Sequence, residues 1–247
     1  MEVDKELPAC DFDEHYGYIN TSTPYPRQRG TRKGQNDGIC GCYNTILFGK
    51  GEFIMNIRDF RKPEQNINEI FTNRWSPRAM SGQEIDEKTL LTLFEAARWA
   101  PSSNNNQPWR FIYARRNTKH WNTFFNLLAE GNQVWAKNAA VLIVVISKNT
   151  FDSGKPARTH SYDTGAAWVN FALQGSLDGL VVHGMQGFDY DKAKEVLRIP
   201  DGYQVEAMIA VGKKGKKEDL PDFLQEQEFP SSRKIIAEFA MEGSFQK

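Results

Sequence analysis

The sequence predicts an α+β fold, because helix-like periodicity alternates with short strand-like segments along most of the chain. Leucines and aromatic residues recur at helical spacing over residues 86–99, and the helix starts with Asp86, a good N-cap. Arg110–Ala114 reads as a strand by its aromatic and β-branched content. Ala139–Ile146 is apolar at every position, which is typical of a central strand covered by helices on both faces.

The remaining elements follow from the same patterns. We expect further helices at residues 66–73, 121–128, 162–180 and 191–198, and further strands at residues 181–182 and 204–211. Residues 1–54 lack a sustained period and are interrupted by glycine and proline, so we expect a disordered N-terminal extension there, or an upstream start that is mis-assigned. Residues 55–247 are then the folded domain.

Composition excludes several classes of function. The 31 basic and 31 acidic residues give a formal net charge of +0, so we expect no broad attraction to nucleic acid or to an anionic membrane. The longest apolar run, Ala139–Ile146, is far shorter than the roughly 20 residues that span a bilayer. The acidic amino terminus has no apolar segment of the kind found in secretory signals, and a cytoplasmic protein is expected.

Cysteine usage points to no metal or disulfide framework. Cys10, Cys40 and Cys42 are an odd number of thiols, all before residue 43. Together with His15 they could form a metal site, but their spacing is not a usual zinc pattern, and free thiols are the preferred interpretation. The sequence also has no nucleophile elbow, Walker loop or G-x-G-x-x-G motif.

Two polar stretches are candidates for binding. The segment 101–108 carries hydroxyls and amides between a helix and a strand, so it is either a solvated loop or a turn that binds a planar, hydrogen-bonding ligand. Arg74, Ser76 and Arg78 alternate, so in an extended chain they point one way. Two guanidiniums and a hydroxyl suit a phosphate or an electron-rich ring edge, although a solvated surface has the same composition.

Pro101-Ser102-Ser103 followed by Gln107-Pro108-Trp109 resembles the signature of the FMN-dependent nitroreductase family, and so does Arg74-Trp75-Ser76-Pro77-Arg78. The resemblance covers about residues 67–245. It implies a nitroreductase-like fold with a central, mostly antiparallel sheet flanked by helices and a domain-crossing C-terminal tail. It also implies an obligate homodimer that binds FMN between its subunits.

The resemblance assigns cofactor-binding roles to both stretches. Arg74 and Ser76 would hold the ribityl phosphate, and Arg78 would lie towards the pyrimidine edge of the ring. The turn that embraces the flavin matches the following positions: Pro101, Ser102, Ser103 and Asn105, with Gln107 adjacent.

Later positions complete the implied site. Asn132 matches an amide near the ring, with Gln133 as the alternative. Gln186 and Gly187 match a loop that passes over the ring face, where many family members carry an acidic residue in place of Gln186. Glycine there permits close approach of the backbone.

The tail supplies the last implied ligand. Arg233 matches the carboxy-terminal basic residue that binds the phosphate. The usual basic neighbour two residues earlier is replaced by Ser231, so part of the phosphate charge must be met elsewhere, with Lys234 as one candidate.

The implied function is an oxidoreductase in which FMN carries the chemistry and no side chain is a catalytic residue. Two electrons would pass from NAD(P)H to the flavin and then to a small electrophile such as a nitroaromatic or a quinone, by ping-pong kinetics. The alternatives are a flavin-binding protein without turnover and a specialised branch of the fold that acts on flavin itself or on halogenated aromatics.

Overall fold

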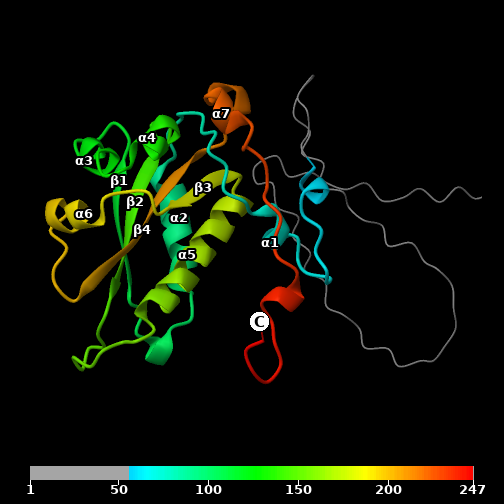
Figure 1. The fold of residues 1–247 in the computed structure, drawn as a ribbon. Helices are drawn as coiled ribbons and strands as arrows, with labels where there is room; N and C mark the ends of the chain where they lie inside the picture. Colours follow the sequence, from blue (N-terminus) through cyan, green and yellow to red (C-terminus); the bar gives the residue numbers. More distant parts are fainter. Residues whose placement is uncertain (1–55, 247) are drawn as a thin grey trace, which may run out of the picture. The chain divides into compact units, whose positions relative to one another are not determined.

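The structure, a computed structural model, describes residues 56–246, so the expectations for residues 1–54 and their three cysteines lie outside it. Four antiparallel strands form one sheet in the order β1-β2-β4-β3 (Figure 1). The strands are β1 (Trp109–Arg115), β2 (Val141–Lys148), β3 (Leu180–Met185) and β4 (Tyr203–Lys213). The expected antiparallel sheet is therefore present, and β2 and β4 are its central strands.

Helices cover both faces of the sheet (Figure 1). The two long ones, α2 (Glu87–Arg98) and α5 (His160–Leu177), pack against each other and cover one face. The other face is covered by shorter helices: α3 (Trp121–Phe125), α4 (Glu130–Ala136) and α6 (Tyr190–Val196). Two four-residue helices, α1 (Ile70–Asn73) and α7 (Asp222–Gln225), stand near the ends of the described chain.

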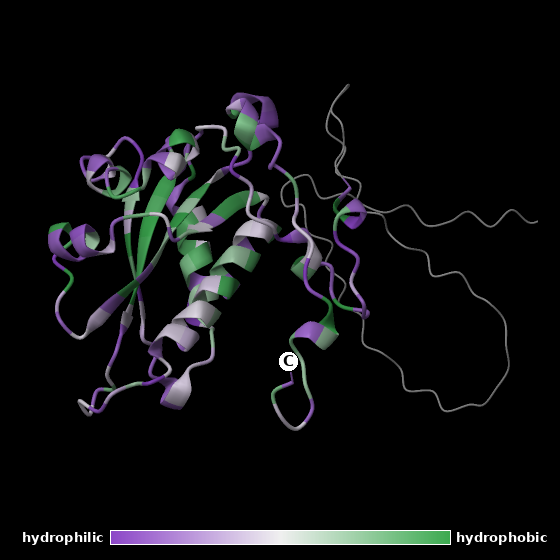
Figure 2. Ribbon diagram, viewed as in Figure 1, coloured by the Kyte–Doolittle hydropathy of each residue, from purple (hydrophilic) through white to green (hydrophobic). Residues whose placement is uncertain are grey.

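Strand β2 is apolar from Val141 to Ile146 because it separates two cores. Ile143 and Val145 belong to the cluster under α2 and α5, whereas Leu142 and Val144 belong to the cluster under the shorter helices. Successive side chains of a strand point to opposite faces, so every residue of β2 from Val141 to Ser147 is buried. Figure 2 shows the same pattern, with the strands hydrophobic and the outer surfaces of the helices more hydrophilic.

The main differences from the sequence-based elements concern the helices. The long helix ends at Leu177, and Leu180 already belongs to β3, because Gly179 makes the turn in a left-handed conformation (φ 69°). The helix expected over residues 121–128 ends at Phe125, and the helix α4 that follows was not expected. Its first residues are polar and include a glycine, and only Trp135 and Ala136 of α4 are buried.

The C-terminal tail lies beside the first described residues. Phe229 stacks on Phe60 with ring centroids 5.7 Å apart, and the Ile236 N–H donates to Glu64 Oε2 at 2.7 Å. The tail exposes large apolar side chains: Ile235, Ile236, Phe239, Met241 and Phe245. Its crossing onto a partner subunit stays a prediction. Between residues 56 and 246, no helix has the length and apolar character needed to cross a membrane.

Candidate functional site

The segment that carries Arg74, Ser76 and Arg78 is fixed by side chains from distant parts of the chain. His183 Nδ1, on β3, lies 2.8 Å from the carbonyl oxygen of Pro77 and donates to it. The buried carboxylate of Glu228 accepts from the backbone N–H groups of Arg78 and Ala79, each at 2.8 Å. Burial lowers the pKa of His183, which favours the neutral ring. These hydrogen bonds fix the backbone of the segment, and with it the positions from which its alternating side chains project.

Three guanidiniums gather at the beginning of this segment. Arg61 is buried and donates to the carbonyl oxygens of Thr72 (2.8 Å), Arg74 (2.7 Å) and Ser231 (3.1 Å). Burial lowers the pKa of both Arg61 and Arg74, and the positive charge of Arg233 lowers each of them further. Within the described part of the chain, no carboxylate forms a salt bridge with any of the three arginines. An anion would relieve their mutual repulsion.

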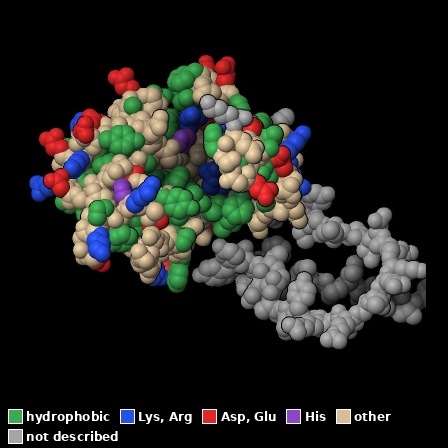
Figure 3. Space-filling view, turned by 60° about the horizontal axis from the view of Figure 1, so that its bottom comes forward, with side chains coloured by type: hydrophobic (Ala, Val, Ile, Leu, Met, Phe, Trp, Pro, Cys, Tyr) green, Lys and Arg blue, Asp and Glu red, His purple; other side chains and the backbone are tan. Residues whose placement is uncertain are grey.

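A cavity of about 610 Å³ opens next to Arg74. Arg74 and Ser76 line it from the 74–78 segment, and Arg74 Nη1 donates to Ser76 Oγ at 3.3 Å. Trp168 of α5 and Ile209 of β4 are among its apolar lining residues. Figure 3, a space-filling view, shows basic side chains inside a hollow of the molecular surface. The cavity thus joins a cationic end to apolar walls, as an anionic ligand with a flat ring requires.

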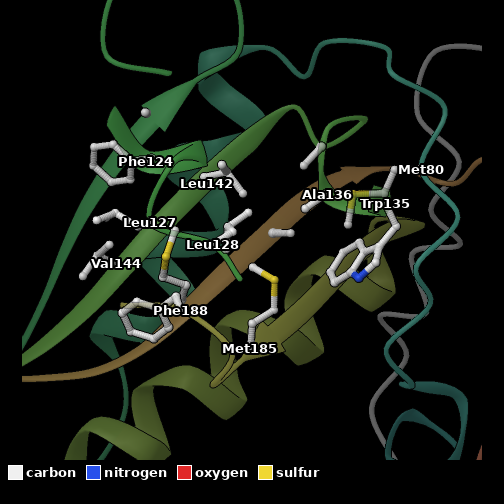
Figure 4. Packing of buried hydrophobic residues seen from close by; sticks show 14 of the residues in the cluster. Met80, Phe124, Leu127, Leu128, Trp135, Ala136, Leu142, Val144, Met185 and Phe188 are labelled. Atoms are coloured by element: carbon white, nitrogen blue, oxygen red, sulfur yellow. The ribbon is translucent and has the colours of Figure 1, made fainter. Parts of the chain in front are cut away.

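The loop after β3 borders the same cavity through Gln186. The loop is anchored on both sides, because Met185 and Phe188 are buried and point into the core under the shorter helices (Figure 4). Asn132 Nδ2 donates to the carbonyl oxygen of Gly187 at 3.0 Å, and a Cβ at Gly187 would lie 2.8 Å from that nitrogen. The glycine is therefore needed for this contact.

The structure separates the two candidate amides. Gln133 Nε2 donates to the Leu128 carbonyl oxygen at 2.9 Å, away from the loop, whereas Asn132 contacts the loop. Asn132 is therefore the better candidate for a ring-facing amide.

The polar turn between α2 and β1 has an unusual backbone. Asn104, Asn105 and Gln107 all have positive φ (51°, 53° and 47°), a conformation that costs energy for residues other than glycine. The buried carboxylate of Asp163, on α5, accepts from the Ser103 N–H at 3.1 Å. Asn106 Nδ2 is buried and has no hydrogen-bond partner among residues 56–246. Strain and an unpaired amide of this kind are typical of a binding turn.

The expected site residues fall into separate groups. Of the expected residues, Arg74, Ser76 and Gln186 line the cavity. Others border this group or support it without lining the cavity: Arg78, Asn132, Gly187 and Arg233. The turn residues form a third group that does not line the cavity: Pro101, Ser102, Ser103, Asn105 and Gln107.

A model of the nitroreductase family matches residues 71–132 and 117–213, more than half of the chain. The chain belongs to the nitroreductase family. The order and spacing of its motifs therefore identified the family correctly.

Comparisons with individual proteins support this assignment to the family. A crystal structure described as "the oxidoreductase containing FMN" is 48% identical, with a TM-score of 0.73, and the match covers 75% of this chain and 96% of that one. A nitroreductase family protein from Streptococcus pneumoniae TIGR4 is 21% identical (TM-score 0.56; 71% and 98% covered) and shows the shared fold. A Rhodopseudomonas palustris protein named "Putative NADH dehydrogenase/NAD(P)H nitroreductase" is 24% identical over 159 residues, covering 57% of this chain and 80% of its own. The nitroreductase-like α+β fold is thereby confirmed.

Several residues that shape the candidate site of this nitroreductase-family protein were not found from the sequence. Arg61, His183 and Glu228 hold the 74–78 segment, and Asp163 holds the polar turn. Each acts on a segment between 13 and 150 positions away. The only local signal is an isolated polar residue in an otherwise apolar element, as for His183 in β3.

Proposed function

We propose that the protein binds FMN without a covalent bond and catalyses two-electron transfer from NAD(P)H to a small electrophile such as a nitroaromatic or a quinone. Family membership and the similar structure described as an FMN-containing oxidoreductase support the cofactor. The name of the Rhodopseudomonas palustris relative supports a nicotinamide co-substrate. FMN, when bound, supplies the capacity to take up and pass on two electrons, and the protein supplies binding, orientation and electrostatics.

The observation that carries this proposal is the group Arg61, Arg74 and Arg233, with Ser76, at one end of the cavity. A phosphate dianion would offset guanidinium charges that burial has already separated from water. Arg74 and Ser76 contact the phosphate in this proposal, whereas Arg61 holds the backbone of Arg74. Arg233 supplies one positive charge, and Arg61 supplies a second one in place of the basic neighbour that Ser231 replaces.

The other expected ligands act on the ring. Gln186 and Gly187 pass over the face of the ring. Asn132 fixes the distance between this loop and the ring by its hydrogen bond to the Gly187 carbonyl oxygen. Arg78 faces the pyrimidine edge. Gln186 in place of an acidic residue leaves the loop without a negative charge next to the ring.

The polar turn acts from a second copy of the chain. Its strained backbone and unpaired amide indicate a binding role, yet it does not line the cavity of its own subunit. A homodimer with FMN between subunits brings the turn of one copy to the cavity of the other. The exposed apolar side chains of α5 and of the tail, among them Val169 and Phe239, are suited to that interface.

Two measurements on the purified protein test these proposals. Bound flavin gives a visible absorption spectrum, and anaerobic stopped-flow mixing with NADH or NADPH should bleach it rapidly. A nitroaromatic or a quinone added afterwards should restore the colour. Flavin that binds but is not bleached by either nucleotide would instead indicate a binding protein without turnover.

Sedimentation tests the dimer separately. Because FMN binds only the assembled state in this proposal, dilution should release subunits and flavin together. A monomer that retains its full complement of flavin would contradict the shared site.

A further inference from the structure

A second polar group lines the cavity at a distance from the arginines. Glu206 of β4 and Ser161 and Thr164 of α5 are lining residues. Glu206 lies four positions before Ala210, the β4 partner of His183, which holds the 74–78 segment. At about 3.3 Å per residue, this separation is at most roughly 13 Å along the strand, because Glu206 lies at a β-bulge. We name Glu206, Ser161 and Thr164 the acidic corner of the cavity.

The carboxylate in this corner is oriented by a chain of hydrogen bonds. His160 Nδ1 lies 2.7 Å from the fully buried Ser147 Oγ, and Ser147 Oγ in turn donates to Glu206 Oε1. Ser161 Oγ donates to the same oxygen at 2.7 Å. The other oxygen, Oε2, has only a long contact of 3.4 Å from Gln204 Nε2. One carboxylate oxygen is therefore held in place while the other keeps capacity to accept a hydrogen bond from a ligand.

Thr164 gives an independent sign that something binds here. Its side chain is 2% exposed, and Oγ1 has no hydrogen-bond partner among the described residues. Buried hydroxyls are normally paired, and a threonine inside a helix usually bonds to the carbonyl oxygen one turn earlier. Thr164 lines the cavity, but its Oγ1 has almost no accessible surface, so a ligand in the cavity can supply the missing partner only when the side chain rotates towards it.

We propose that the acidic corner recognises a cationic, hydrogen-bond-donating group, such as a protonated amine, on an aromatic electron acceptor. The cavity is lined by the guanidinium of Arg74, the carboxylate of Glu206 and the ring of Trp168. A carboxylate only accepts hydrogen bonds and attracts positive charge, so it favours an ammonium group and disfavours a second carboxylate. This inference rests on the proposed oxidoreductase function and names the class of acceptor.

Three acceptors with the same reducible group test it: 4-nitrobenzylammonium, nitrobenzene and 4-nitrobenzoate. With wild-type protein, kcat/KM should be highest for the cation and lowest for the anion. In Glu206→Gln, the hydroxyls of Ser147 and Ser161 can still donate to the amide oxygen, but the negative charge of the carboxylate is lost. The ratio of kcat/KM for the cation to that for the anion should then fall about tenfold or more, the size expected for a charge-assisted hydrogen bond. Nitrobenzene corrects both values for general loss of activity.

Two further variants serve as a control for the loss of a carboxylate and as a separate test of Thr164. Glu195→Gln removes a carboxylate from the exposed surface of α6, outside the cavity, and should leave the ratio unchanged. Thr164→Val removes only the unpaired hydroxyl, so no internal hydrogen bond is lost and folding should be retained. It should weaken binding of benzylammonium, a non-reducible analogue, to the flavin-loaded protein in calorimetry, with little effect on benzoate.

The outcomes separate this proposal from the one on which it rests. If neither NADH nor NADPH bleaches the flavin of the wild-type protein, the oxidoreductase function is wrong. If the flavin is bleached but none of the three acceptors is reduced, the acceptor class named here is wrong. If the wild-type protein reduces them, but the cation-to-anion ratio is the same in wild type and Glu206→Gln, the acidic corner does not select acceptors. A Glu206→Gln variant that slows flavin reduction by NADH while leaving that ratio unchanged would assign the corner to the nicotinamide instead, and would also overturn the proposal.

Discussion

Arg61 Nη1 donates to the carbonyl oxygen of Arg74 at 2.7 Å, and Arg61 Nε donates to that of Ser231 at 3.1 Å. One buried guanidinium thus ties the segment that begins at Arg74 to the tail that carries Arg233. These contacts belong to tertiary structure, and the proposed phosphate site depends on them.

Replacing Arg61 by methionine should weaken FMN binding at least tenfold, because the two remaining arginines lose their common support and one positive charge is lost. Riboflavin, which lacks the phosphate, should lose much less affinity. Fluorescence titration of both ligands into flavin-free protein measures the two dissociation constants. Arg58→Met, at an exposed arginine paired with Glu69, is the matched control. Equal losses for FMN and riboflavin would show that Arg61 acts through folding alone.

The lowered pKa of His183 predicts a pH dependence of stability. Burial is the main cause, and the charges of Arg78 and Arg74 add to it. Since the folded-state pKa lies below the unfolded value of 6.5, the unfolded chain takes up the proton first as pH falls. The stability contribution of the neutral ring is present above pH 6.5 and decreases below it. Urea unfolding at pH 7.5 and 5.5 should show a larger loss for wild type than for His183→Gln. His120→Gln, at an exposed position, should behave like wild type.

Much of the fold could be predicted because its signals are local. Asp86 caps α2 as expected, accepting from the Thr89 N–H at 2.7 Å, and the apolar run at 139–146 is the central strand β2. Helix α4 was missed because its first residues are polar and are typical of a turn. Trp135 could be recognised as a core residue only from its burial in the structure. Its neighbour in the core, His183, lies with its ring centroid 4.6 Å away.

The site was less predictable than the fold. Of the three alternating residues, Arg74 and Ser76 line one cavity, whereas Arg78 does not, so alternation alone did not define the lining. Arg61 lies in a segment without a clear pattern, and Glu206 looks like an ordinary position of a strand. Their roles depend on contacts with Ser231 and with Ser147 and Ser161, and sequence spacing carries no information on such pairs.

Two glycines of α5 should respond in opposite ways to alanine. A Cβ at Gly175 would lie 2.4 Å from Val182 Cγ2, whereas a Cβ at Gly165 would meet nothing within 4 Å. Gly175→Ala should lower the free energy of unfolding by about 1–3 kcal/mol, because α5 must move away from β3. Gly165→Ala should raise it by about 0.5–1 kcal/mol through helix propensity. Urea unfolding of the flavin-free variants measures both. A stable Gly175→Ala variant would mean that the helix and strand are less tightly packed.

Arg78 should set the reduction potential of the bound flavin. Two-electron reduction places negative charge on the pyrimidine end of the ring, and a fixed cation there stabilises the reduced form more than the oxidised one. Arginine stays protonated at any working pH. A contribution of about 1–3 kcal/mol is reasonable for one charge-assisted contact. Since roughly 30 mV corresponds to 1.4 kcal/mol for a two-electron couple, Arg78→Ala should lower the potential by some tens of millivolts.

Spectroelectrochemical titration compares Arg78→Ala with Arg74→Ala and with Arg158→Ala, whose arginine is exposed. Arg74→Ala should weaken FMN binding more and shift the potential less, because Arg74 serves the phosphate. A readout without flavin is available as well, since the charge of Arg78 lowers the pKa of His183. In Arg78→Ala, the NMR titration of His183 should move to higher pH. If His183 shifts but the potential does not, the side chain lies near β3 as described, and another residue is the cation at the pyrimidine edge.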